Sequence, residues 1–158
     1  MNNFKDLRLK QGLSIAQLAE FLHIGAGTVA RWESHDTTPT LAQFLKLCHF
    51  MQCTPAQLCG LTDNEIPLFT DNITTCSSMY LTAEMLCDNC SFGLVLPYDI
   101  SERFVKGDTC LFSFDRNAEA DSLVFAIDDN YNEFLYIYKE YDANLQIIAI
   151  CRQLLSSF

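Results

Sequence analysis

Two short helical patterns separated by a tight turn constrain the fold of this chain more than any other feature. Ser14 stands where a helix N-cap is expected, and Gln17 follows three residues later, as in a capping box. His23–Gly25 form the turn, and a second helix is predicted from about residue 26 to 34. The apolar residues that would face inward from the two helices are Ile15, Leu18, Ala19, Leu22, Val29 and Trp32.

Three further helices are predicted around this pair. Phe4 and Leu7, with a stop at Gly12, outline a helix before it, and Pro39 precedes a fourth helix. A fifth begins at Thr54, with Pro55 at the first helical position, where its missing N–H is harmless. The inward positions of the fourth helix are Leu41, Phe44, Leu45, Leu47 and Cys48. Five short helices with a tight turn between the second and third predict an all-α helix-turn-helix domain over residues 1–61.

The same segment resembles a known family. The string GLSIAQLAEFLHIGAGTVARWESHDTTPTLAQFLKLCHFMQCTPAQL is similar to the Xre, or phage Cro/CI-type, helix-turn-helix, which has the λ-repressor-like fold. The resemblance covers residues 4–60 without a gap and includes the Leu-Ser, Leu-Ala, Arg-Trp-Glu and Pro-Thr-Leu landmarks. It implies that the third helix enters the major groove of double-stranded DNA, while the N-terminus of the second meets a phosphate. The residues expected to contact DNA are Arg8, Lys10, Ser14, Gln17, Gly25, Ala26, Gly27, Thr28 and Arg31.

The tip of the third helix departs from the family pattern. Small residues occupy 25–27, and Ile15 replaces the Gln that is frequent at the start of the second helix. Gly and Ala cannot form the bidentate hydrogen bonds that distinguish bases, so Thr28 and Arg31 are the expected base readers, and Ala26 can only touch a thymine methyl. The tip is open to two interpretations, a helix that has lost its readout or one that lets its backbone approach DNA closely.

Charge divides the chain in the same way. Residues 1–61 hold five Lys and Arg against four Asp and Glu, whereas the rest holds five against sixteen. The bases of the first part cluster at Lys5, Arg8 and Lys10. Because phosphate contacts come mostly from Lys and Arg, only the first part is suited to meet DNA.

A polar stretch, residues 62–78, is predicted to be a linker, and residues 79–158 a β-rich domain for dimerisation and regulation. Short β-prone runs separated by polar turns recur there, which favours a small antiparallel sheet. The runs are 92–96, 109–114, 122–127, 133–141 and 145–151. The fold class is therefore a two-domain α + β chain.

A helix-turn-helix domain followed by a small β domain is similar to the repressors of the LexA and phage CI group, many of which cut themselves with a Ser nucleophile and a Lys base. Aligning Gly107-Asp108 with the family's Gly-Asp motif places Tyr98 at the nucleophile position, and Lys139 falls near the base. Ser101 is a conceivable substitute in a shifted register. We therefore expect no catalytic residues and no enzyme activity, with autocleavage as the alternative.

No apolar run is long enough for a membrane span, and the N-terminus lacks the apolar segment of a secretory signal, so a cytoplasmic protein without a membrane partner is expected. The eight cysteines are then predicted to be reduced, several of them in the core. The Cys87-Asp88-Asn89-Cys90 motif lacks a second ligand pair, so ordinary thiols are favoured over a metal or redox site. The three histidines are expected to be turn or surface residues, and no cofactor is predicted.

Together these features predict a phage or prophage repressor that binds a double-stranded DNA operator as a homodimer or higher homo-oligomer. Because the Ser-Lys pair is incomplete, release by an antirepressor protein is expected instead of self-cleavage. Two alternatives stay open, an autocleaving repressor of the LexA type and an antirepressor-like or antitoxin-like adaptor that does not read DNA.

Overall fold

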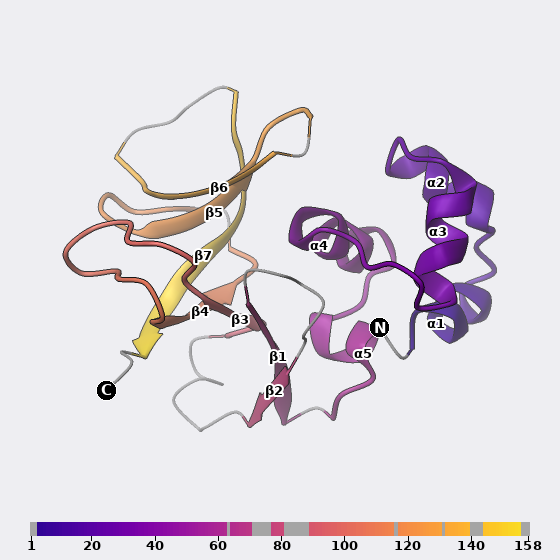
Figure 1. Cartoon of the computed structure of the whole chain (residues 1–158), viewed down its shortest axis with the longest axis horizontal. Coiled ribbons are helices and arrows are strands. Elements are labelled where there is room, and N and C mark those ends of the chain that lie inside the picture. The colour runs from indigo at the N-terminus through magenta and orange to yellow at the C-terminus, as the bar shows by residue number, and fades with distance from the viewer. Residues whose placement is uncertain are drawn as a thin grey trace.

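The computed structural model describes residues 3–62, 64–70, 77–80, 89–115, 117–130, 132–139 and 144–155, with the backbone alone for 77–80. A helical part and a β-sheet lie next to each other (Figure 1). In that view α4 and α5 lie on the side of the helical part that faces the sheet, and α1, α2 and α3 lie on the far side (Figure 1).

The five predicted helices are confirmed. They are α1 (Phe4–Lys10), α2 (Ile15–Phe21), α3 (Ala26–Glu33), α4 (Leu41–Phe50) and α5 (Pro55–Cys59). Three of them begin with a complete capping box, formed by the pairs Ser14 and Gln17, Thr40 and Gln43, and Thr54 and Gln57. Each box satisfies two of the backbone groups that a helix N-terminus leaves unpaired. These short helices therefore have starts that are fixed by sequence neighbours.

The sheet has seven strands in the order β2-β1-β3-β4-β7-β5-β6. The strands are β1 (Glu65–Phe69), β2 (Ser77–Tyr80), β3 (Phe92–Val95), β4 (Thr109–Ser113), β5 (Leu123–Ile127), β6 (Glu133–Ile137) and β7 (Gln146–Leu155). The last five coincide with the five predicted β-prone runs to within a few residues. The sheet is mixed and not wholly antiparallel as predicted, because β1 and β3 pair in parallel. A side chain at Gly93 of β3 would come within 2.7 Å of Leu68, so glycine allows this close pairing.

The segment predicted as a linker, 62–78, is corrected at residues 65–69, which form β1, and at 77–78, which begin β2. The segment contains Pro67, and proline cannot donate to a sheet ladder. Pro67 lies outside the parallel ladder with β3, which involves only Leu68 and Phe69, and is paired with Ser78 in the antiparallel ladder with β2. Phe69 is fully buried, and burying its ring provides a reason for this short apolar run to join the sheet.

The helical part packs directly against the sheet. The ring of Phe44 on α4 meets Phe69 on β1 edge-on, with ring centroids 5.2 Å apart. Phe69 contacts Phe92 at 6.1 Å, and Phe92 stacks on Phe112 at 5.3 Å. Buried residues of α1 to α5 and of five strands belong to one hydrophobic cluster. The two parts of the chain therefore share a core.

Four of the six cysteines whose side chains the structure describes are buried, namely Cys48, Cys59, Cys90 and Cys110, as expected for core thiols. Cys90 packs with Ile66 and Leu111, and Cys87 lies outside the described residues. In the described ranges, His, Cys, Asp and Glu side chains form no group of three or more suited to a metal ion. None of the described helices is long and apolar enough to cross a bilayer.

Candidate DNA-binding surface

The turn between α2 and α3 is held by local backbone contacts. The N–H of His23 donates to the carbonyl of Glu20 at 3.1 Å, and that of Ile24 donates to Ala19 at 3.0 Å. His23 adopts a left-handed conformation with φ of 54°, which histidine tolerates better than a β-branched residue does. Val29 and Trp32 anchor the inner face of α3 in the core. The turn and this anchor fix the orientation of α3.

The outer face of α3 is open at its first turn. Gly25 is the N-cap and makes no side-chain cap, and 25–27 are all exposed. A Cβ atom added at Gly27 would meet nothing within 4 Å. The protein fold itself therefore does not require glycine at 27. The absence of a side chain there leaves the backbone of the helix open to a partner.

Thr28 and Arg31 are the two polar side chains that the structure brings together on this face. The Nη2 of Arg31 donates to the Oγ1 of Thr28 at 3.3 Å, and both side chains are on the exposed side of α3. Their spacing of three residues places them one helical turn apart. A guanidinium with several remaining donors thus lies beside the glycine-containing tip.

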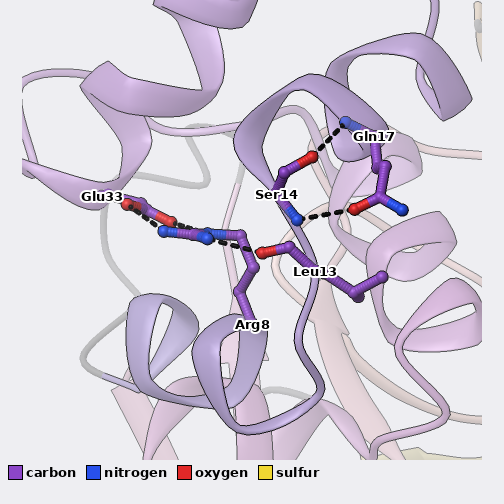
Figure 2. A network of polar contacts seen from close by, with 5 residues as sticks. All are labelled: Arg8, Leu13, Ser14, Gln17 and Glu33. Carbon is purple, nitrogen blue, oxygen red and sulfur yellow. Dashed lines mark hydrogen bonds and ion pairs between the residues drawn. The ribbon is translucent and has the colours of Figure 1, made fainter.

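The start of α2 presents Ser14 and Gln17. The Oγ of Ser14 accepts from the backbone N–H of Gln17 at 3.1 Å, and the Ser14 N–H donates to the Gln17 side-chain oxygen at 2.8 Å (Figure 2). The amide nitrogen of Gln17 points away from Ser14 (Figure 2). It is exposed and oriented outward by the capping box. Ser14, by contrast, uses its hydroxyl to cap the helix.

Arg8 has a structural role, contrary to the expectation that it contacts DNA. Its Nε lies 2.5 Å from the Oε1 of Glu33, and its Nη1 donates to the carbonyl of Leu13 at 2.6 Å (Figure 2). Only 8% of the Arg8 side chain is exposed. The hydrogen bond that Arg8 donates to the Glu33 carboxylate raises the pKa of Arg8. The basic cluster expected at the N-terminus is therefore reduced to Lys5 and Lys10, which are exposed on α1.

Glu33 was missed as the partner of Arg8, although the sequence carries a signal. Arg8 lies four residues after Phe4, on the face of α1 that enters the core. Glu33 lies next to buried Trp32. Two opposite charges at core-facing positions are expected to pair, since an unpaired buried charge is costly.

In the sheet, the Gly107-Asp108 motif has a local structural explanation. Gly107 has φ of 92°, a conformation that favours glycine, and its N–H donates to the carbonyl of Leu96 at 3.0 Å. Asp108 is 2% exposed, and its carboxylate accepts from the backbone N–H of Val105 at 3.2 Å. The motif thus forms the turn that leads into β4.

The three side chains discussed for autocleavage lie near one another. Tyr98, Ser101 and Lys139 line one shallow hollow of about 560 Å³. Tyr98 is 51% exposed, and Lys139 lies after β6, which ends at Ile137 although the predicted run extended to residue 141. The Oγ of Ser101 accepts from the N–H of Arg103 at 3.3 Å. The structure therefore places a hydroxyl and an amine on the same hollow.

Comparison with known proteins supports the assignment of the helical part as a helix-turn-helix domain. Residues 4–58 match the family model described as Helix-turn-helix. Curated proteins give no significant match. A solved structure titled "Crystal Structure of FeII HppE" aligns over 94% of this chain and 95% of its own, with 14% identity and a TM-score of 0.33. An overlap this low supports no inference about this chain. The N-terminal domain is thus a helix-turn-helix domain of the class that binds double-stranded DNA and regulates transcription.

Proposed function

We propose that this protein is a sequence-specific transcriptional repressor of the phage or prophage CI type, which binds a two-fold operator as a dimer and does not cleave itself. The observation that carries the proposal is the exposed first turn of α3, within the segment that matches the helix-turn-helix model. This turn belongs to the helices on the far side of the domain from the sheet (Figure 1).

In this proposal Arg31 and Thr28 read base edges. The guanidinium of Arg31 supplies donors suited to the O6 and N7 atoms of guanine, and its contact with Thr28 limits its freedom before binding. Gly27 lets the backbone of α3 approach the groove. Gln17 and Lys10 supply contacts to phosphates that set the register.

Dimerisation is proposed because one domain of this size buries little surface on DNA, whereas two linked half-sites multiply affinity. The sheet is the proposed self-association domain. Its edge strand β6 carries Phe134, which is 38% exposed. The acidic C-terminal part is the surface that we propose for a basic antirepressor.

The test is selection of genomic fragments by the purified full-length protein, followed by anisotropy titration of the selected site at low salt. We expect a palindromic site and a dimer in sedimentation experiments. Arg31→Ala should lose about 1–3 kcal/mol of operator affinity, and Lys106→Ala, an exposed cation in the sheet part, should lose little. Failure to enrich any fragment would favour an adaptor that does not read DNA.

A second candidate is an autocleaving repressor, which the shared hollow of Ser101 and Lys139 favours. A neutral Lys amine could accept the proton of the Ser101 hydroxyl during attack on a peptide carbonyl. Incubation at alkaline pH followed by mass spectrometry separates the two candidates. Our proposal expects an intact chain. Two fragments produced by cleavage of a single peptide bond would establish the second candidate, provided that neither Ser101→Ala nor Lys139→Ala produces them.

A further inference from the structure

A cavity of about 680 Å³ lies between the helical part and the sheet. Its apolar walls come from both sides, with Phe21 and Leu45 from α2 and α4, and Ile148 and Phe114 from β7 and the residue after β4. Small-molecule sites have this range of volume, are mainly apolar and occur preferentially between domains. The cavity therefore has the size, lining and position of a ligand site.

The charged and amide side chains that line the cavity are nitrogen-containing. Lys46 and His49 of α4 are its ionisable nitrogen groups, and the side chains of Gln52 and Gln146 add amides. No Asp or Glu is among the described residues that line it, although the chain has a net charge of −10. A lining whose described residues include Lys46 and His49 but no acid, in a protein this acidic, favours an anion over a cation.

The residues that line the cavity differ in their exposure. Leu45 and Ile148 are buried, whereas His49 is exposed and Lys46 is half-buried. Phe114 is 41% exposed, so part of its ring is open to a bound molecule. A ligand with an apolar body would cover this ring, and its charged group would stay near α4.

We propose that this cavity binds a small amphipathic organic anion, a carboxylate or sulfonate on an aromatic or medium-chain aliphatic body. The body contacts Phe21, Phe114 and Ile148, and the acid group is placed by Lys46 and His49. Nothing in the DNA-binding surface is required for this binding.

The regulatory consequence rests on the proposed function. The ligand touches both the helical part and the sheet, so it stabilises the arrangement in which the two are docked. Ligand binding changes DNA affinity only if DNA favours or disfavours that docked arrangement. In a repressor, the anion would then be an effector that changes the affinity of the protein for its operator.

The first experiment uses 1-anilinonaphthalene-8-sulfonate as the anionic probe and N-phenyl-1-naphthylamine as its uncharged counterpart. We expect saturable binding of the sulfonate to the full chain at one site. Lys46→Gln should weaken the sulfonate by at least about threefold and leave the uncharged probe unchanged, since only the charged interaction is lost. Lys106→Gln, which removes an exposed cation outside the cavity, is the matched control. Ile148→Trp fills the cavity and should abolish binding of both probes.

A second measurement uses the native chain and so does not depend on a variant that folds. Cys53 lines the cavity and is half-buried, and its hydrogen bond with Cys48 lowers the pKa of the Cys53 thiol. Cys151 lies outside the cavity, is also half-buried, and has its thiol pKa lowered by the hydrogen bond with Cys110. At ten times its dissociation constant, the sulfonate should slow alkylation of Cys53 by N-ethylmaleimide about tenfold and leave Cys151 unchanged.

Equal protection of the two thiols, protection of neither, or sulfonate binding that Ile148→Trp does not affect would overturn the ligand site. Operator titration with and without the sulfonate tests the regulatory step. A protein that binds the probe at this cavity but no DNA would refute the proposed function and leave the ligand site established. An operator affinity unchanged by a saturating probe would refute the regulation alone.

Discussion

Arg8 on α1 and Glu33 at the end of α3 form a buried ion pair. The Nε and Oε1 atoms are 2.5 Å apart, and a second contact joins Nη2 to Oε2 at 3.2 Å. Each side chain is 8% exposed. Through its third contact, with the carbonyl of Leu13, the guanidinium also reaches the loop before α2. One side chain therefore links the first helix to the end of α3 and to the loop before α2, the two elements of the candidate surface.

Replacing Arg8 by methionine should destabilise the protein by about 2–4 kcal/mol, because it leaves the Glu33 carboxylate buried without a partner. The double variant Arg8→Met/Glu33→Leu should recover part of this loss, since it removes both charges. Urea denaturation measures the free energy of unfolding of each variant.

Lys10→Met is the control, because it removes an exposed cation from the same helix. Its effect should stay within about 0.5 kcal/mol. A single variant Arg8→Met as stable as Lys10→Met would contradict the structural role of the ion pair.

Gly27 and Gly12 provide a matched test of backbone conformation. A Cβ added at either position meets nothing within 4 Å, but only Gly12 has a positive φ, of 69°. Gly27→Ala should therefore raise stability by about 0.4–1 kcal/mol, and Gly12→Ala should lower it by about 1 kcal/mol. Thermal unfolding of the two variants checks the opposite signs. If both variants changed stability in the same direction, the positive φ of Gly12 would not be what determines the effect of the added side chain.

The helices were predictable because the signals that define them are local. Ser14, Thr40 and Thr54 each have their capping partner three residues away, so a short window of sequence contains both halves of the interaction. The third helix has no such cap, since Gly25 is its N-cap, and its tip was expected from the family resemblance.

The ion pair and the first strand depend on contacts that such a window does not contain. Arg8 and Glu33 are 25 residues apart, so the partner of Arg8 lay outside the local sequence. The neighbouring basic residues, Lys5 and Lys10, instead suggested that Arg8 contacts a phosphate. β1 depends on parallel pairing with residues 93 and 94, more than 20 positions later. The cavity is still less visible, since Phe21 and Ile148 come from opposite ends of the chain.

Asp128, in the turn between β5 and β6, is expected to titrate below the ordinary range of an aspartate. The carboxylate of Asp128 accepts from the side chain of Asn132 at 2.7 Å and from the N–H groups of Asn132 and Asn130 at 2.9 and 2.8 Å. These bonds, led by the Asn132 side chain, lower the pKa of Asp128 below its ordinary value. The contribution to stability is therefore present above the ordinary pKa and is lost as pH falls through the depressed value. Asn132→Ala should shift the Asp128 titration upward in carboxyl-detected NMR, and an unchanged titration would contradict this origin.

The contact between the carboxylate of Glu133 and the start of α4 tests the docking of the two parts of the chain. The backbone N–H of Ala42 donates to the Oε1 of Glu133 at 2.7 Å, across 91 positions of sequence. This N–H belongs to the unpaired first turn of α4, where a negative charge is favourable. Glu133→Ala should lower stability by about 0.5–1.5 kcal/mol and speed hydrogen exchange of the Ala42 amide severalfold. Thr40→Ala, which removes only the side-chain cap within α4, should destabilise the helix start without undocking the sheet. An Ala42 amide that exchanges at the same rate in Glu133→Ala and in the unmodified protein would mean that this carboxylate does not hold the helical part on the sheet in solution.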